Sequence, residues 1–499
     1  MHEAPPPTSP SAATPAPGSS SSAVPAEPLS HGLKQRHLTM LGLGGVIGAG
    51  LFVGSGAGIA VAGPAIVVSY LIAGALAMLV MRMLGEMSAA MPASGSFSVH
   101  AERALGRWAG FSVGWLYWFL LVVVLAVEAT AAAQIAHGWV PGIEPWAWVL
   151  LFMVVFTAAN LTAVKNFGEF EFWFASLKVG AIVVFLVLGL LAVFGWLPDT
   201  DPVGMTNLTG QGGFLPNGWG GVVSGVLTVV FAFGGLEVVT IAAAETDDPA
   251  RAVGRAVRSA VVRILFFYVG SMLVIVTVLP WTAQQAGLSP YVKVLDAIGV
   301  PSAGQIMNIV VFVALLSALN ANLYGSSRMV FSLAERGEAP RGLLKVSGGG
   351  SRETTGAGSH ETTGAASRET TGGVPRRAVL ASVAFGFVSV LLNLLWPDTV
   401  FLYMLNSVGA VLLFVWALIA ASQLRLRARL EQEAPEALSL RMWCFPYLTW
   451  VTLAGLFGVL LLMLTDEAAR PQVLWSAGAT ALVLLVAVGR QWRERRGSA

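Results

Sequence analysis

The sequence predicts an all-α polytopic membrane protein, and three observations support this fold class. First, 56% of the 499 residues are hydrophobic and 11% are charged, and the mean hydropathy is +0.73, a composition that does not suit a soluble domain. Second, apolar runs of about 20 residues, long enough to cross a hydrocarbon core of roughly 30 Å, recur along the chain. Third, glycines interrupt two of these runs.

The apolar runs number about twelve, and each is expected to form a transmembrane helix. Short polar or Gly/Pro-containing segments separate them, so neighbouring spans cross in opposite directions. Their approximate bounds are 39–60, 64–84, 109–136, 146–164, 173–197, 219–244, 260–281, 303–333, 378–396, 399–421, 444–464 and 472–489.

The basic residues are distributed unevenly around these spans. When the N-terminus is placed in the cytoplasm, all of the 29 lysines and arginines except Lys178, Lys293 and Arg470 fall in cytoplasmic segments or inner helix ends. Cytoplasmic loops of membrane proteins are enriched in lysine and arginine. The sequence therefore predicts a multi-pass membrane protein with both termini in the cytoplasm.

Three segments are expected to lie outside the transmembrane domain, which is predicted over 37–490. Residues 1–36 begin with a stretch rich in Pro, Ala and Ser that lacks the order of a cleavable signal peptide, so they are expected to form a disordered cytoplasmic tail. Residues 346–374 contain the sequence SRETTG twice and SHETTG once, which indicates a flexible cytoplasmic insertion, with a regulatory segment as the alternative. Residues 491–499 are expected to form a C-terminal tail.

Several classes of site are absent from the sequence. Cys444 is the single cysteine, which excludes an internal disulfide and a metal site built from clustered cysteines. Neither a metal-ligating His pair nor a phosphate-binding P-loop occurs. We therefore expect no enzyme and no ATP-driven pump, and neither a cofactor, a metal nor a nucleic acid as a partner.

The two glycine-interrupted runs indicate a transporter. They are 44–52 (GGVIGAGLF) in the first span and 231–237 (FAFGGLE) in the sixth. Lipid tolerates non-helical backbone only where protein or a watery cavity satisfies the freed amides and carbonyls. Close helix packing would explain either break alone. Corresponding breaks five spans apart are the pattern of inverted-repeat transporters, whose half-helix ends face a site near the bilayer midplane.

Several motifs together resemble those of bacterial amino acid permeases of the amino acid/polyamine/organocation superfamily, and most closely the γ-aminobutyrate (GABA) permeases. The resemblance runs from Leu38 to about Trp281, whereas the last four predicted spans share only their number with the family. Besides the first-span glycines, the motifs are 92–97 (PASGSF), 114–118 (GWLYW), 165–173 (KNFGEFEFW), 240–245 (TIAAAE) and 327–329 (SRM).

The resemblance implies a protein of the bacterial plasma membrane with a LeuT-like fold. Five helices would be followed by five more of inverted topology, with discontinuous helices 1 and 6 and two additional C-terminal helices. In this sequence the two repeats would cover about 39–197 and 219–421, and the additional helices would cover about 444–489.

Backbone groups of the two breaks are expected to hold an amino acid. The first span runs outward, so the half-helix that begins near Gly50 would aim its N-terminal amides at the midplane and favour a carboxylate. The sixth span runs inward, so carbonyls near Ala232 could accept hydrogen bonds from an ammonium group. For the phenylalanines of the second break, plain packing is the alternative. The predicted substrate-binding residues are Ile47, Gly48, Ala49, Gly50, Phe231, Ala232, Phe233, Gly234 and Gly235.

Lys178 is expected about five residues inside the fifth span, roughly 8 Å deep at 1.5 Å per residue. A charge at this depth is costly and needs an explanation. One interpretation is that its long stem reaches back to the cytoplasmic interface. The resemblance implies the other: related permeases keep a lysine facing the broken first helix, where sodium-coupled relatives bind a cation, and this lysine can take up and release a proton.

Two carboxylates within predicted spans are further candidates for proton coupling or gating. Glu237 follows the second break by two residues, so it either neutralises the dipole of the next half-helix or acts as a gate or proton sensor. Glu128 lies late in the third span, where it either reaches the outer interface or lines the transport pathway.

These observations predict a secondary active transporter that imports amino acids by proton symport, with GABA or another neutral amino acid as substrate. Its expected partners are the amino acid, protons and the lipid bilayer. An amino acid exchanger is the alternative within transport, and a membrane sensor without net transport is the alternative class. The polar segments outside the spans are too short for a signalling domain, which favours transport over sensing.

Overall fold

The computed structural model describes residues 47–91, 96–162, 167–197, 204–237, 249–284, 287–344, 376–397, 399–465, 467 and 470–497. Predictions for the N-terminal tail, for the glycines before Ile47, for the motif at 240–245 and for the insertion at 346–374 fall outside these residues. The same holds for 92–95 and 163–166, which carry parts of two other motifs.

All secondary structure in the described part of the chain is helical, as the sequence predicts. Every predicted span overlaps a helix. The main helices are α2 (Ala49–Phe52), α3 (Gly54–Ala62), α4 (Ile66–Ala90), α5 (Ser96–Leu105), α6 (Arg107–Trp139), α7 (Pro145–Thr162), α8 (Phe167–Val193), α9 (Thr206–Thr209), α10 (Gly218–Val230), α12 (Pro249–Val278), α13 (Pro290–Ala297), α14 (Ala303–Glu335), α15 (Arg376–Leu395), α16 (Val400–Glu433), α17 (Tyr447–Thr465) and α18 (Arg470–Gly497). Short 3₁₀ helices are η1 (Gly63–Ala65), η2 (Phe231–Phe233), η3 (Trp281–Ala283), η4 (Arg341–Leu344) and η5 (Pro435–Ala437).

The lengths and hydropathy of these helices are those of a membrane protein. Among the described residues, 8 helical stretches are long and apolar enough to cross a bilayer, and three shorter apolar helices accompany them. The first of the long stretches, Gly54–Ala90, contains α3, η1 and α4, and therefore covers parts of the first two predicted spans. The number of about twelve crossings remains a prediction.

The helices extend beyond the apolar runs in several places. The helix α16 continues to Glu433, past the predicted end at 421, and α18 continues to Gly497, within the predicted tail. Both extensions are rich in charged residues, so hydropathy cannot detect them, although the residues are good helix formers. The short helices α5 and α13 lie between predicted spans. They also contain charged residues, so hydropathy did not detect them.

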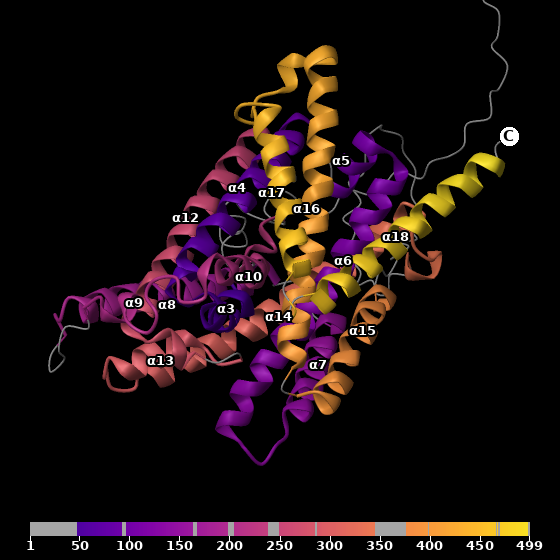
Figure 1. The fold of residues 1–499 in the computed structure, drawn as a ribbon. Coiled ribbons are helices and arrows are strands. Elements are labelled where there is room, and N and C mark those ends of the chain that lie inside the picture. Colours follow the sequence, from indigo (N-terminus) through magenta and orange to yellow (C-terminus); the bar gives the residue numbers. More distant parts are fainter. Residues whose placement is uncertain are drawn as a thin grey trace, which may run out of the picture. The chain divides into compact units, whose positions relative to one another are not determined.

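Helices at corresponding positions of the two predicted repeats pack against each other. The first and sixth spans meet through α3 and α10, the second and seventh through α4 and α12, the third and eighth through α6 and α14, and the fourth and ninth through α7 and α15. This pairing is the arrangement that an inverted repeat produces. The later helices α16 and α17 lie side by side (Figure 1), and α18 packs against α16 and α6.

Helix α6 runs through the interior of this packing. Of its most apolar part, 78% is buried, against 28% for α18. Most residues in this part of α6 therefore face other helices rather than lipid. Glu128, in the second half of α6, is one of these buried residues and contacts the first broken helix.

Candidate functional site

Both predicted breaks are present in the structure. In the second, α10 passes into η2, and Gly234 then turns away from helical geometry with ψ of 141°. Gly235 follows with φ of +98°, a left-handed conformation that favours glycine over residues with a Cβ. In the first, α2 begins after Gly48, and Val53 separates α2 from α3.

The two breaks are in direct contact. A Cβ placed on Gly50 would lie 2.7 Å from the Cα of Ala232 and 2.8 Å from a ring carbon of Phe231. Only the absence of a side chain at Gly50 lets the two backbones approach this closely. The structure therefore brings together two segments that the sequence places about 180 residues apart.

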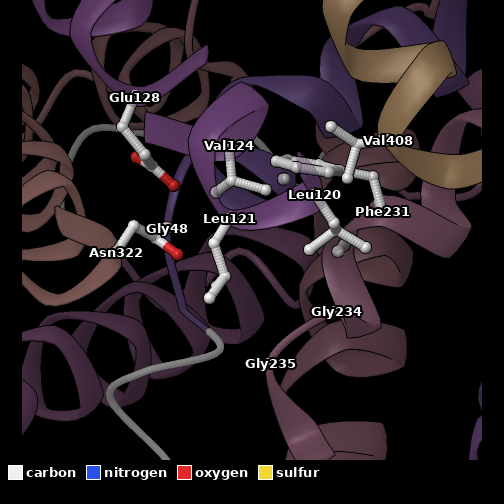
Figure 2. A pocket seen from close by; sticks show the side chains of 12 residues that line it. Gly48, Leu120, Leu121, Val124, Glu128, Phe231, Gly234, Gly235, Asn322 and Val408 are labelled. Atoms are coloured by element: carbon white, nitrogen blue, oxygen red, sulfur yellow. The ribbon is translucent and has the colours of Figure 1, made fainter. Parts of the chain in front are cut away.

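A cavity of about 30 Å³ lies between the breaks, with space for about two water molecules. Most of its side chains are apolar, and the polar ones are Glu128 and Asn322. Figure 2 shows these two on one side of the cavity and Leu120, Val124, Val408 and Phe231 on the other. The lining residues are Gly48, Gly50, Leu120, Leu121, Val124, Glu128, Phe231, Ala232, Gly234, Gly235, Asn322 and Val408.

Most of the predicted substrate-binding residues reach this cavity, and three do not. The cavity is lined by Gly48, Gly50, Phe231, Ala232 and the glycines of the second break. Ile47, Ala49 and Phe233 are buried nearby without lining it. The ring of Phe233 instead packs against Tyr70 and Tyr268, at centroid distances of 6.1 and 5.2 Å.

The carboxylate of Glu128 binds the start of the first broken helix. The backbone N–H of Ala49 donates to both carboxylate oxygens, at 3.0 and 3.1 Å. Glu128 is 3% exposed, and a Cβ on Gly48 would lie 2.3 Å from its Oε1 atom. Glu128 therefore points into the site rather than to an outer interface, and it occupies an amide that we predicted to hold a substrate carboxylate.

Lys178 is buried and forms an ion pair within the protein. Its Nζ atom lies 3.8 Å from Oε1 of Glu171, and the two side chains are 1% and 2% exposed. The hydroxyl of Ser317 on α14 donates to the other oxygen of Glu171 at 3.0 Å. Lys178 also lies close enough to Glu128 for the two charges to interact. A chain of charged groups thus connects α8 with the first broken helix.

Glu237 supports the second break without lining the cavity. Its carboxylate accepts a hydrogen bond from the N–H of Gly235 at 2.9 Å and another from the indole N–H of Trp416 on α16. The hydroxyl of Tyr117 on α6 lies beside it. Because Glu237 is fully buried among these groups, it connects the broken helix with two neighbouring helices.

The carbonyl of Ala232 already has a partner. The hydroxyl of Tyr268 on α12 donates to it at 2.8 Å. We predicted that this carbonyl would accept from a substrate ammonium, so in this conformation an ammonium would have to share it or displace Tyr268. A carbonyl oxygen has two lone pairs, and sharing is therefore compatible with its chemistry.

Reasoning from the sequence missed Glu171, Asn322 and the apolar lining residues. Glu171 is part of a motif that carried the family resemblance, and it precedes Lys178 by seven residues on the same helix, a spacing that places both on one face and could have identified the pair. Asn322, Val408 and the lining residues of α6 lie in uninterrupted spans, where one apolar or amide side chain resembles its neighbours. Only the packing of the helices selects them.

Comparison with known proteins decides which family this geometry belongs to. Residues 37–489 match the profile of the family described as "Amino acid permease". The chain belongs to the amino acid permease family. The permease is 47% identical over 453 residues to a GABA permease of Bacillus subtilis (strain 168), across 91% of this chain and 92% of the relative. It is 48% identical over 451 residues to an aromatic amino acid transport protein of Corynebacterium glutamicum, across 90% of this chain and 92% of the relative.

A solved structure supports the fold. The crystal structure of a manganese transporter from Eremococcus coleocola matches the permease with a TM-score of 0.55, over 91% of this chain and 92% of the transporter. The two sequences are 14% identical, so this likeness concerns the fold alone. Together these findings confirm the predicted family, the transporter fold and amino acid import as the function.

Proposed function

We propose that the permease imports a neutral amino acid, with GABA among the candidates, together with protons. The proposed setting is the plasma membrane of a bacterium, with both termini in the cytoplasm as the distribution of basic residues predicts. The hydrogen bond from the amide of Ala49 to Glu128 carries the proposal. In the proposed binding mode, the titratable carboxylate of Glu128 and the carboxylate of the substrate both need this amide.

The lining of the cavity favours a neutral substrate. Leu120, Leu121, Val124, Val408 and Phe231 give it apolar walls. A charged substrate side chain would lose its hydration there and would need an oppositely charged partner. Among the described lining residues, Glu128 is the one ionisable side chain, and it is bound to Ala49. Side chains without charge therefore fit these walls best.

Competition for the amide of Ala49 would link substrate binding to protonation. An ionised Glu128 and the carboxylate of a substrate repel each other and need the same donor. A proton on Glu128 removes its charge and favours entry of the substrate carboxylate. Reciprocal linkage then requires that bound substrate favours the protonated form, as symport demands.

The buried pair of Lys178 and Glu171 is the proposed source of this proton. It lies beside Glu128 in the interior, where a titratable group can exchange a proton with a neighbour rather than with bulk water. Exchange of one amino acid for another needs no titratable group. A sensor without net transport needs no pathway for protons across the bilayer. The buried charges therefore support symport over both alternatives.

The test uses the purified permease in proteoliposomes, with labelled GABA and labelled phenylalanine as probes. Each of the twenty amino acids and GABA competes in turn. An inside-alkaline pH gradient should drive accumulation above the external concentration, and neutral amino acids should compete better than lysine, arginine, aspartate or glutamate. A Glu128→Gln variant should lose the pH dependence of substrate binding.

Other outcomes identify the alternatives. Uptake that requires internal amino acid and ignores the pH gradient would indicate an exchanger and would contradict symport. Specific binding without any uptake would indicate a sensor. Strong competition by lysine or glutamate over every neutral amino acid would contradict the neutral substrate.

A further inference from the structure

Asn322 occupies a particular position on α14. Four residues earlier on the same helix, the methyl group of Ala318 lies 3.2 Å from the point where a Cβ on Gly48 would stand. Three residues later, a Cβ on Gly325 would lie 3.6 Å from Leu121 on α6. Residues at these spacings share one face of a helix. Asn322 therefore lies between the contacts of α14 with the first broken helix and with α6, where it lines the cavity.

The orientation of the Asn322 amide is set by its own helix. Its Nδ2 atom donates to the carbonyl of Ala318 at 2.8 Å. A carbonyl can only accept, so the nitrogen of the amide must be the atom that faces Ala318. The Oδ1 atom then points the other way. Within the described part of the chain it accepts no hydrogen bond, and Figure 2 shows an oxygen of this side chain turned into the cavity near Leu121.

We propose that Asn322 contacts the substrate and that its Oδ1 atom accepts a hydrogen bond from the substrate's ammonium group. This inference rests on the proposed function, because it requires an amino acid or GABA in this cavity, which has to widen from about 30 Å³ to admit one. An ammonium group needs acceptors, and the cavity offers them mainly on the side of Glu128 and Asn322. The other predicted acceptor, the carbonyl of Ala232, is engaged by Tyr268. Asn322 supplies an acceptor without adding a second negative charge beside Glu128.

The inference makes Asn322 a determinant of specificity. A site built to accept an N–H bond discriminates against an analogue that has no N–H, because the acceptor is then left without a partner. A quaternary trimethylammonium group keeps the positive charge and lacks the donor. Loss of a hydrogen bond to a charged group corresponds to a change in affinity of about 10- to 100-fold.

The experiment compares amines with their quaternary analogues. The probes are GABA, phenylalanine and the N,N,N-trimethyl derivative of each, and the measured quantity is the inhibition constant of each against labelled GABA or labelled phenylalanine uptake. Asn322→Leu removes the acceptor at similar volume. We expect this variant to weaken binding of the free amine about 10- to 100-fold and to leave the inhibition constant of the trimethyl derivative nearly unchanged. Discrimination between the two compounds should therefore disappear.

Two further variants separate recognition from folding. Asn322→Ala removes the same oxygen without adding bulk and should also abolish discrimination, which keeps the inference testable if the leucine variant is poorly expressed. Asn320→Leu is the matched control, because Asn320 lies on the same helix outside the cavity lining and its oxygen accepts from Asn160 at 2.8 Å. It should change expression more than discrimination.

The outcomes distinguish this inference from the proposed function. If the wild-type protein takes up neither GABA nor any of the amino acids, the proposed function is contradicted, and this inference with it. A second outcome overturns the inference alone: wild-type uptake is normal, and both Asn322 variants weaken binding of the amine and of the trimethyl derivative equally. Unchanged inhibition constants in both variants overturn it as well.

Discussion

Gly50 and Ala232 touch across the two helix breaks, so closely that a Cβ on Gly50 would lie 2.7 Å from the Cα of Ala232. The neighbouring atom belongs to backbone, which cannot move aside as a flexible side chain can. The contact between the two residues thus fixes how near the broken helices approach, and it is the most direct target for mutation.

Gly50→Ala should abolish uptake while leaving membrane insertion intact, because the added methyl group would push the two breaks apart. Gly48→Ala should be milder for folding, since its Cβ would meet the end of the Glu128 side chain at 2.3 Å, and that side chain can move. Labelled uptake at equal expression measures both variants. Gly180→Ala on α8 is the matched control, because its Cβ would meet nothing within 4 Å. Normal uptake by Gly50→Ala would show that the close contact is dispensable.

Lys178→Ala should uncouple transport from the pH gradient. Accumulation against a concentration gradient should fail in proteoliposomes, while exchange of internal for external substrate should persist, because the proposed proton donor is missing but the cavity is intact. Loss of one partner from a buried ion pair also costs about 3–5 kcal/mol of stability. Expression and thermal stability therefore have to be measured alongside transport.

A double variant separates coupling from this loss of stability. Lys178→Met together with Glu171→Gln removes both charges and should restore much of the stability, yet accumulation should still fail. Gradient-driven accumulation comparable to the parent in the double variant would contradict a role of Lys178 in carrying the proton. Glu237 would then be the next titratable group to test beside a broken helix.

A second buried network connects α4 with α16 and with the segment before α17. The carboxylate of Glu86 accepts from Arg427 and Gln423 on α16 and from the backbone N–H of Met442. Glu86 and Arg427 are 1% and 5% exposed. Arg427 also donates to Glu431 at 2.8 Å. These bonds hold the later helices to the helices of the first predicted repeat.

Arg427→Met should destabilise the permease by about 3–5 kcal/mol, because it leaves the Glu86 carboxylate buried without its cation. Thermal unfolding of the protein in detergent measures the effect. Arg425→Met, two residues away and exposed, should change the unfolding temperature little. Addition of Glu86→Gln to Arg427→Met should recover part of the loss, and an unchanged unfolding temperature in Arg427→Met would show that the network is not needed for stability.

The sequence by itself determined the membrane fold, the family and the position of both breaks. A bilayer requires each span to be apolar and to satisfy its own backbone hydrogen bonds, and that requirement is local to each segment. The runs of apolar residues and the glycines at 48, 50, 234 and 235 therefore carried the signal. Hydropathy did not detect charged helical extensions such as the end of α16, because it reports only the part of a helix that lies in lipid.

The partners that buried polar side chains find on other helices were decided by the tertiary structure alone. Glu128 binds the amide of Ala49, 79 residues away in the chain, and Asn322 lines the cavity from a helix with no break. Lys178 and Glu171 lie seven residues apart on the same helix, so their proximity is local, but the burial of the pair and the bond from Ser317 depend on how α8 packs against α14. Which side chains of different helices meet is set by packing between distant segments, and no local pattern of residues encodes it.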